Sequence, residues 1–281
     1  MHIIKLNAID STNSYLRTLS NEETLVDYTV VMAKFQTNGR GQMGTIWNSE
    51  SSKNLTVSVF KDISKLFIEH PFCISMATSL AIIKTLQSFS IPKLSIKWPN
   101  DILSEDKKIC GVLIENVIKQ NSFRATIIGV GLNVNQTNFK DLPKASSLKL
   151  LSGKTFNLDE VLHTLMKYLK YYFMLLRKHE HEYLYQEYET YLFRKNKPST
   201  FMDVEGALFS GIIKKVTVSG NLQVLLEDNI LKEFDFVYDS SIYPISVHPD
   251  YGYKIDELNA FFKAMQPFFF ILHHYTEYFS G

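Results

Sequence analysis

The sequence has little cysteine, little net charge and no apolar segment long enough to cross a membrane. Its two cysteines, Cys73 and Cys110, are not spaced as metal ligands and lie in apolar contexts, as is typical of buried thiols in a reducing compartment. The formal net charge is +1, which provides no bulk attraction to nucleic acid or a membrane surface. No signal peptide precedes the strand-like His2–Leu6, and the apolar run Phe268–Leu272 is far shorter than the roughly 20 residues of a membrane helix. These absences predict a cytoplasmic protein that binds neither nucleic acid nor membrane.

The length and the changing texture of the chain predict two folded domains. A chain of 281 residues exceeds the usual size of one domain. From Thr200 on, short apolar strands alternate with turn residues such as Ser219–Asn221, a pattern typical of a small β-barrel of about 45 residues. We therefore predict an α+β fold. It comprises a mixed β-sheet domain packed with helices over residues 1–197, a small C-terminal β-barrel over 198–245, and a tail over 246–281 to which no role is assigned.

Several segments of the first domain have clear secondary-structure patterns. Apolar residues at helical spacing predict helices over His70–Phe89 and Leu158–Tyr188, whereas Asn138–Ser152 is loop-like. The aromatic residues of the second helical region are interpreted as packing residues. The mostly apolar run Phe123–Val134 predicts a central strand, with Gly129 and Gly131 near its end.

The segment Gln36–Trp47 is predicted to be a glycine-rich loop between two strands. It holds Gly39, Gly41 and Gly44 within six residues, and its one cation is Arg40. Glycine lets a ligand approach the backbone closely, so the loop suits an anionic ligand with an aromatic or apolar portion. The letters match the dinucleotide fingerprint, but the residues that follow form a poor helix and no suitably placed acidic residue comes after them. A mobile surface loop is the alternative at this point.

Two polar clusters lie at the ends of predicted elements. Ser11, Thr12 and Asn13 precede a helix, and since capping needs only one of them, the others are available to bind a polar ring of a ligand. Lys97, Asn100 and Asp101 gather where Pro99 ends a strand. Functional side chains often project from such a position.

These motifs, in this order, resemble the catalytic domain of biotin protein ligases (holocarboxylase synthetases). The resemblance covers roughly residues 1–245 and rests on five motifs: Ser11–Asn13, Gln36 with Gly39–Gly41, Lys97-Trp-Pro-Asn-Asp101, Lys107-Lys-Ile-Cys-Gly111 and Gly129–Asn133. It implies the class II synthetase-like fold of biotin–lipoate ligases with a small C-terminal barrel. It also implies ATP-dependent conversion of biotin to biotinyl-5′-AMP. The biotinyl group is then transferred to a lysine of a biotin carboxyl carrier protein or carboxylase biotin domain.

The resemblance also implies roles for individual residues. Trp47 would stack on adenine, and Lys108 would contact the biotin carboxylate and the α-phosphate. Because Asp101 is a carboxylate close in sequence to the cationic site and beside Asn100, we hypothesise that it orients or deprotonates the acceptor amine. The implied catalytic residues are Lys108, Arg40, Lys97 and Asp101. The implied biotin-binding residues are Ser11, Thr12, Asn13, Gln36, Gly39, Arg40, Gly41, Gln42, Lys108, Gly111 and Gly131. The implied nucleotide-binding residues are Arg40, Gln42, Trp47, Asn100, Lys108 and Asn133. Mg²⁺ is expected to bind through the ATP phosphates rather than in a protein-only cage.

The sequence departs from the common family pattern in two places. Gln42 and Thr45 stand where many relatives carry arginine, so the loop has fewer cations. Some relatives begin with a helix-turn-helix repressor domain, but here Ser11 is already part of the first motif. We therefore expect an enzyme only, as a monomer or a homodimer.

Two other functions stay open on the sequence. A lipoate–protein ligase would share the reaction type and the fold, but it would need an apolar tunnel without partners for a ureido ring. A non-enzymatic ligand-binding or interaction module, using the barrel and the tail, would not release pyrophosphate from ATP.

Overall fold

The computed structural model describes residues 2–66, 68–119, 122–140, 142–203, 207–235 and 238–239. The predicted tail over 246–281 lies outside these residues. The chain divides into two compact units, one formed by Met1–Lys195 with Lys215–Asn221 and a second that begins at Asn196–Lys214 and continues from Leu222. The domain boundaries at residues 197 and 245 stay predictions.

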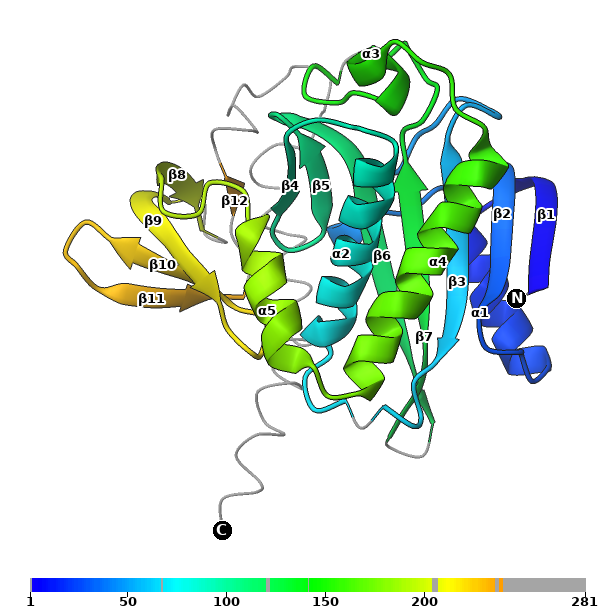
Figure 1. Cartoon of the computed structure of the whole chain (residues 1–281), viewed down its shortest axis with the longest axis horizontal. Helices are drawn as coiled ribbons and strands as arrows, with labels where there is room; N and C mark the ends of the chain where they lie inside the picture. The colour runs from blue at the N-terminus through cyan, green and yellow to red at the C-terminus, as the bar shows by residue number, and fades with distance from the viewer. Residues whose placement is uncertain are drawn as a thin grey trace. The chain divides into compact units, whose positions relative to one another are not determined.

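A mixed β-sheet forms the centre of the first unit (Figure 1). Its strands are β1 (His2–Ile9), β2 (Thr29–Gln36), β3 (Leu55–Asp62), β4 (Leu94–Lys97), β5 (Asp101–Ser104), β6 (Lys107–Lys119) and β7 (Ser122–Leu132). Their order in the sheet is β1-β2-β3-β7-β6-β5-β4. Only β1 and β2 pair in parallel among the described strand pairs. The prediction that β7 is a central strand is confirmed.

Helices cover both faces of this sheet. They are α1 (Thr12–Glu22), α2 (Phe72–Ser88), α3 (Leu148–Ser152), α4 (Leu158–Arg177) and α5 (His181–Thr190), with a 3-10 turn η1 (Gln42–Gly44) in the glycine-rich loop. Figure 1 shows α2 and α4 in front of the sheet and α1 behind it. In the part of the chain that the structure describes, no helix has the length and apolar composition to cross a membrane.

The long helix predicted over Leu158–Tyr188 is wrong in one respect, because the chain forms two helices there. The break lies between Arg177 and His181, where His179 adopts a left-handed backbone with φ of 60°. Both helices bury apolar residues, so the apolar pattern runs through the break without a proline or glycine to mark it. The loop predicted over Asn138–Ser152 likewise contains the short helix α3, which Ser147 caps.

The two faces of the sheet differ in composition because strand residues alternate in direction. On β7, Ile128 and Val130 are buried and belong to the apolar face. Gly129 and Gly131 point to the other face, where a Cβ on Gly129 would lie 2.5 Å from the side chain of Asn13 in α1. The α1 face is therefore recessed at the middle of the sheet.

The described residues of the second unit build a small antiparallel sheet. Its strands are β8 (Pro198–Met202), β9 (Leu208–Val216), β10 (Leu222–Leu226), β11 (Leu231–Phe234) and β12 (Tyr238–Asp239), in the order β11-β10-β9-β8-β12. Phe209 stacks between Phe201 and Phe234, with ring centroids 5.4 and 4.9 Å away. The predicted fold class, a mixed sheet with helices followed by a small C-terminal β domain, is confirmed.

Candidate active site

One row of directly opposed residues crosses the recessed face of the sheet. Thr56 pairs with Gly131, Gly131 with Gly111, Gly111 with Asp101, and Asp101 with Lys97. Directly opposed residues of neighbouring strands project on the same face. The two glycines thus form a bare patch of backbone, here called the glycine shelf, with a carboxylate and a lysine next to it. Four residues predicted for the site come together in this row.

A β-bulge brings Lys108 to the same place. The register of β5 and β6 shifts between Ile102 and Leu103, so Cys110 opposes Ile102 but Lys108 opposes Leu103. A bulge redirects the side chains that follow it, and here it turns Lys108 to the face of Asp101. The Lys108 Nζ atom lies 2.8 Å from Asp101 Oδ1, and the Asp101 side chain is only 11% exposed. The site therefore contains a partly dehydrated ion pair at the edge of the glycine shelf.

The indole of Trp47 lies on the glycine shelf. A Cβ on Gly111 would stand 2.9 Å from Trp47 Cζ3, and a Cβ on Gly131 would overlap the indole more severely. Lys108 Nζ lies 5.7 Å from the centroid of the indole ring. The Trp47 Nε1 atom is buried and has no hydrogen-bond partner among the described residues. The shelf is thus a flat surface that accommodates a planar ring.

The glycine-rich loop folds as a short hairpin that presents this indole. Its backbone is closed by hydrogen bonds from Gly41 N to Thr45 O (2.7 Å) and from Trp47 N to Gly39 O (2.9 Å). A Cβ on Gly39 would collide with Trp47 O, and one on Gly41 would collide with Thr45 Oγ1. Gln42 also stabilises the turn, since its carbonyl accepts from Thr45 N and Oγ1. These contacts give the loop a defined backbone conformation.

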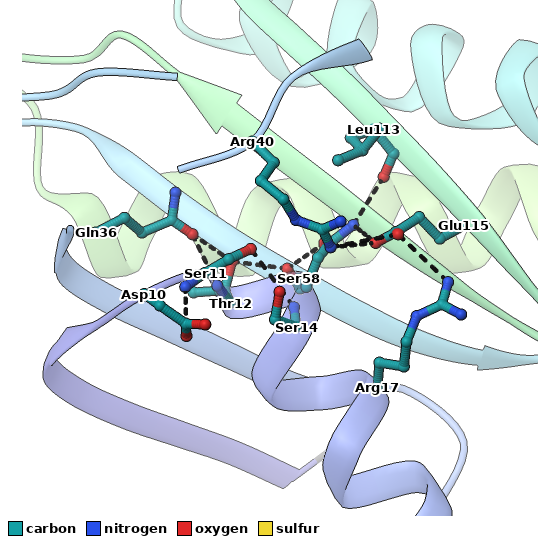
Figure 2. A network of polar contacts seen from close by, with 11 residues as sticks. Asp10, Ser11, Thr12, Ser14, Arg17, Gln36, Arg40, Ser58, Leu113 and Glu115 are labelled. Carbon is teal, nitrogen blue, oxygen red and sulfur yellow. Dashed lines mark hydrogen bonds and ion pairs between the residues drawn. The ribbon is translucent and has the colours of Figure 1, made fainter. Parts of the chain in front are cut away.

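A buried polar network joins the start of α1 to β2 and β3 (Figure 2). Thr12 donates from its backbone N and its Oγ1 to Gln36 Oε1, at 2.8 and 3.0 Å. Ser58 Oγ lies 2.7 Å from Thr12 Oγ1 and 2.5 Å from Asn13 Oδ1. Gly129 provides the space for Asn13, because a Cβ on Gly129 would lie 2.5 Å from Asn13 Oδ1. The result is a compact set of hydroxyl and amide groups on the recessed face.

The other end of Asn13 reaches a carboxylate that also binds two arginines. Asn13 Nδ2 donates to Glu115 Oε2 at 2.7 Å. Arg40 donates to Glu115 at 3.0 and 3.3 Å, and Arg17 of α1 forms an ion pair with it at 3.3 Å. Figure 2 shows the two guanidinium groups on either side of this carboxylate. Arg40 therefore contacts Glu115, whereas Lys108 contacts Asp101.

Three predicted site residues support the backbone in this structure. Ser11 caps α1, accepting from Ser14 N at 3.4 Å. Asn100 Nδ2 donates to Val112 O at 2.6 Å, and Asn133 Nδ2 donates to Ser146 O at 3.0 Å. These contacts fix the turn before β5 and the segment after β7. Among the described residues, no three His, Cys, Asp or Glu side chains gather in a way that could hold a metal ion.

Ser58, Glu115 and Gly129 are not among the predicted site residues, although Gly129 opens one of the five motifs. Ser58 lies between Val57 and Val59 and is fully buried, and Glu115 follows Ile114 in a mostly apolar strand. A polar residue in such a strand needs a buried partner, which is the signal that could have identified both. The role of Gly129 can be recognised only when it is known that α1 packs against β7.

Solved structures of biotin protein ligases share this fold. The structure of biotin protein ligase from Aquifex aeolicus in complex with biotin and ATP matches with a TM-score of 0.71 at 24% identity, covering 83% of this chain and 95% of that one. The enzyme from Leishmania major in complex with biotinyl-5-AMP matches with a TM-score of 0.55 at 20% identity, covering 84% and 99%. The chain thus shares the fold of these structures.

Sequence comparisons agree with the fold. The bifunctional ligase/repressor BirA of Bacillus spizizenii is 32% identical over 178 residues, which cover 61% of this chain and 54% of that protein. The biotin–[acetyl-CoA-carboxylase] ligase of Mycobacterium tuberculosis is 30% identical over 141 residues, covering 49% and 51%. The chain spans about half the length of these curated relatives. Residues 6–133 match the model of the biotin/lipoate A/B protein ligase family. The resemblance to biotin protein ligases is confirmed.

Proposed function

We propose that this protein converts biotin and ATP to biotinyl-5′-AMP and pyrophosphate and then transfers the biotinyl group to a lysine of a biotin-carrier protein. The observation that carries the proposal is the single row that joins the glycine shelf to Asp101 and Lys97, with Lys108 turned into it by the bulge. A polar network suited to a ureido ring lies on the same recessed face. The names of the relatives support the same reaction.

Biotin recognition is assigned to the recessed face. The hydroxyl and amide groups of Thr12, Asn13 and Gln36 offer both donors and acceptors, which is what a cyclic urea requires. Ser11, at the start of the same helix, is within the same buried cluster. Glycine backbone leaves room for the acid's aliphatic chain beside the indole of Trp47. The residues that would contact biotin through or beside this backbone are Gly39, Arg40, Gly41, Gln42, Lys108, Gly111 and Gly131.

Adenylate formation is assigned to the cations at the edge of the shelf. The biotin carboxylate attacks the α-phosphorus of ATP, a new carboxyl–phosphate bond forms, and the bond to pyrophosphate breaks. Both reactants are anions, so cations in a partly dehydrated site oppose their repulsion; a close pair is worth about 4 kcal/mol before desolvation. The position of Lys97 in the row and of Lys108 beside it after the bulge supports this role, and Arg40 lies on the neighbouring loop. Trp47 would stack on the adenine, and Gln42, Asn100 and Asn133 would complete the nucleotide site.

Mg²⁺ is proposed to enter with the ATP phosphates. The carboxylate of Asp101 already forms an ion pair with Lys108 at 2.8 Å, so it is better suited to that pair than to a metal site built of protein ligands. Bound to the phosphates, the ion would add positive charge at the leaving pyrophosphate.

The transfer step is assigned to Asp101. The acceptor lysine must be neutral to attack the acyl carbon, after which the carbon–oxygen bond to AMP breaks. Asp101 is fixed by Lys108 and faces the same surface as the shelf, so its carboxylate can accept the proton of the attacking amine. The partner is proposed to be a biotin carboxyl carrier protein or the biotin domain of a carboxylase.

The polar network favours biotin over lipoate as the substrate. The dithiolane ring of lipoate has no hydrogen-bonding group to match Thr12, Asn13 and Gln36. Against an apolar ring, the donors and acceptors of these groups that the network itself does not satisfy would be left without partners, at a cost of about 1–3 kcal/mol for each.

The proposal is tested with a purified biotin-carrier domain, ATP and biotin. Mass spectrometry is expected to show one biotinyl adduct on one carrier lysine. The Asp101→Asn variant is expected to lose about 100-fold in transfer from preformed adenylate while losing less in adenylate formation. No adduct with the unchanged protein contradicts the proposed function, and equal losses in both steps contradict the role of Asp101.

A further inference from the structure

The glycine-rich loop is fixed to the sheet at two places, both on β6. At one end, Trp47 rests on Gly111, and at the other, Arg40 binds Glu115 at 3.0 and 3.3 Å. Gly111 and Glu115 are four residues apart on the same face of β6, a separation of about 13 Å along the strand. The loop is therefore held across the site, and the Arg40–Glu115 pair is its charged attachment.

Arg40 is the one cationic side chain of the loop between Gln36 and Trp47. With Gln42 and Thr45 at the neighbouring positions, no other loop side chain can form an ion pair with a bound phosphate. Retention of a bound adenylate then depends on how firmly the loop itself is held to the sheet.

The surroundings of Glu115 suit it to hold the loop reversibly. Its side chain is 18% exposed and also binds Asn13 Nδ2 at 2.7 Å and Arg17 at 3.3 Å. When Arg40 leaves, Arg17 and Asn13 still compensate the carboxylate, so opening does not strand a buried charge. Asn13 in turn contacts Ser58, which places the attachment next to the polar network.

We propose that Glu115 is a positioning residue, which acts through Arg40 to keep the glycine-rich loop closed over the site and so limits escape of the bound adenylate. This inference rests on the proposed function for the identity of what is retained. The closure itself is a property of the ligand-free chain. Closure of the loop and retention of the adenylate can therefore be measured separately.

The first experiment measures pyrophosphate release with biotin and ATP in the absence of a carrier. The unchanged protein is expected to give a burst of one pyrophosphate per site and then a slow steady rate set by adenylate escape. Glu115→Gln keeps the acceptor for Asn13 but removes the charge that holds Arg40. It is expected to keep the burst and raise the steady rate about fivefold, the effect of a half-exposed ion pair. General structural damage would lower the burst and could not produce this gain.

Two variants control the first experiment. Glu105 lies in the turn between β5 and β6 and forms an exposed ion pair with Lys93. Glu105→Gln removes this pair and is expected to leave the burst and the steady rate unchanged. Arg40→Met combined with Glu115→Gln is expected to release adenylate no faster than Arg40→Met alone, because both changes break one pair. An unchanged steady rate in Glu115→Gln, or fully additive effects in the double variant, overturns the proposal.

The second experiment needs no catalysis. In a Trp98→Phe background, Trp47 is the remaining tryptophan, and its quenching by acrylamide reports opening of the loop without ligand. Glu115→Gln is expected to raise the quenching constant at least twofold, and Glu105→Gln to leave it unchanged. Equal quenching in all three proteins overturns the closure, whatever the pyrophosphate assay shows. Absence of any burst in the unchanged protein contradicts the proposed function instead.

Discussion

Lys108 and Asp101 form a 2.8 Å ion pair that exists because β6 carries one extra residue opposite β5. Without the bulge, Lys108 would point to the apolar face of the sheet. The residues between Asp101 and Lys108 form a strand, a turn and a bulge. Together these elements bring a cation and a carboxylate to the edge of the glycine shelf.

Lys108→Met is expected to reduce pyrophosphate release from biotin and ATP about 100-fold or more, because it removes a fixed cation from the reacting phosphate. Methionine keeps the aliphatic stem, so the fold is expected to be intact. Lys93→Met, at an exposed lysine of the neighbouring hairpin, serves as the control and is expected to have no effect. Normal release by the Lys108 variant would contradict the assigned role.

Gly129→Ala and Gly131→Ala are expected to have different consequences although they lie two residues apart. A Cβ on Gly129 meets Asn13 at 2.5 Å, so this variant is expected to weaken biotin binding about tenfold, as measured by calorimetry. A Cβ on Gly131 meets the Trp47 indole instead, so that variant is expected to shift the fluorescence of Trp47 toward solvent-exposed emission. If both variants changed the same property equally, the two contacts would not be separable.

The sequence predicted the elements that carry local signals and missed those that depend on tertiary contacts. Gly39, Gly41 and Arg40 were recognised because glycines cluster around one cation between two strands. The motif that contains Asp101 was recognised as part of the site, but its ion pair with Lys108 was not predicted, because the bulge that forms the pair cannot be seen from periodicity. Glu115 was missed because its partners come from α1 and from the loop, at positions distant in the chain.

The break between α4 and α5 shows the same limit in the fold. Helix ends are usually marked by glycine, proline or a capping residue. Here His179 takes the left-handed conformation, which nothing in its local sequence requires. Packing of two helices, rather than helix propensity, decides where this segment turns.

Gly220→Ala is expected to lower the free energy of unfolding by about 3 kcal/mol. Gly220 has a φ of 102°, a Cβ there would lie 2.8 Å from Phe72, and its carbonyl accepts from Trp98 Nε1 at 2.9 Å. Gly153→Ala is the matched control: its φ is 72°, but nothing lies within 4 Å of the added Cβ, so the expected loss is only about 1 kcal/mol. Urea titration followed by circular dichroism measures both, and equal losses would rule out the contact with Phe72.

The two cysteines are expected to be unreactive toward a thiol reagent at pH 8 in the folded protein and reactive after unfolding. Burial raises the pKa of Cys73 to about 12, and burial together with the charge of Asp101 raises the pKa of Cys110 well above its usual range. Because the unfolded thiols ionise near pH 9 and the folded ones do not, these residues reduce stability as the pH rises above 9. Rapid labelling of the native protein would contradict their burial.

The central claim is that the site activates biotin, and pyrophosphate release from ATP without any carrier tests it most directly. Biotin alone is expected to give one pyrophosphate per site in a rapid burst, and lipoate alone is expected to give none. A burst with lipoate and none with biotin would contradict the assignment of the polar network of Thr12, Asn13 and Gln36 to a ureido ring. No release with either acid would contradict adenylate formation itself.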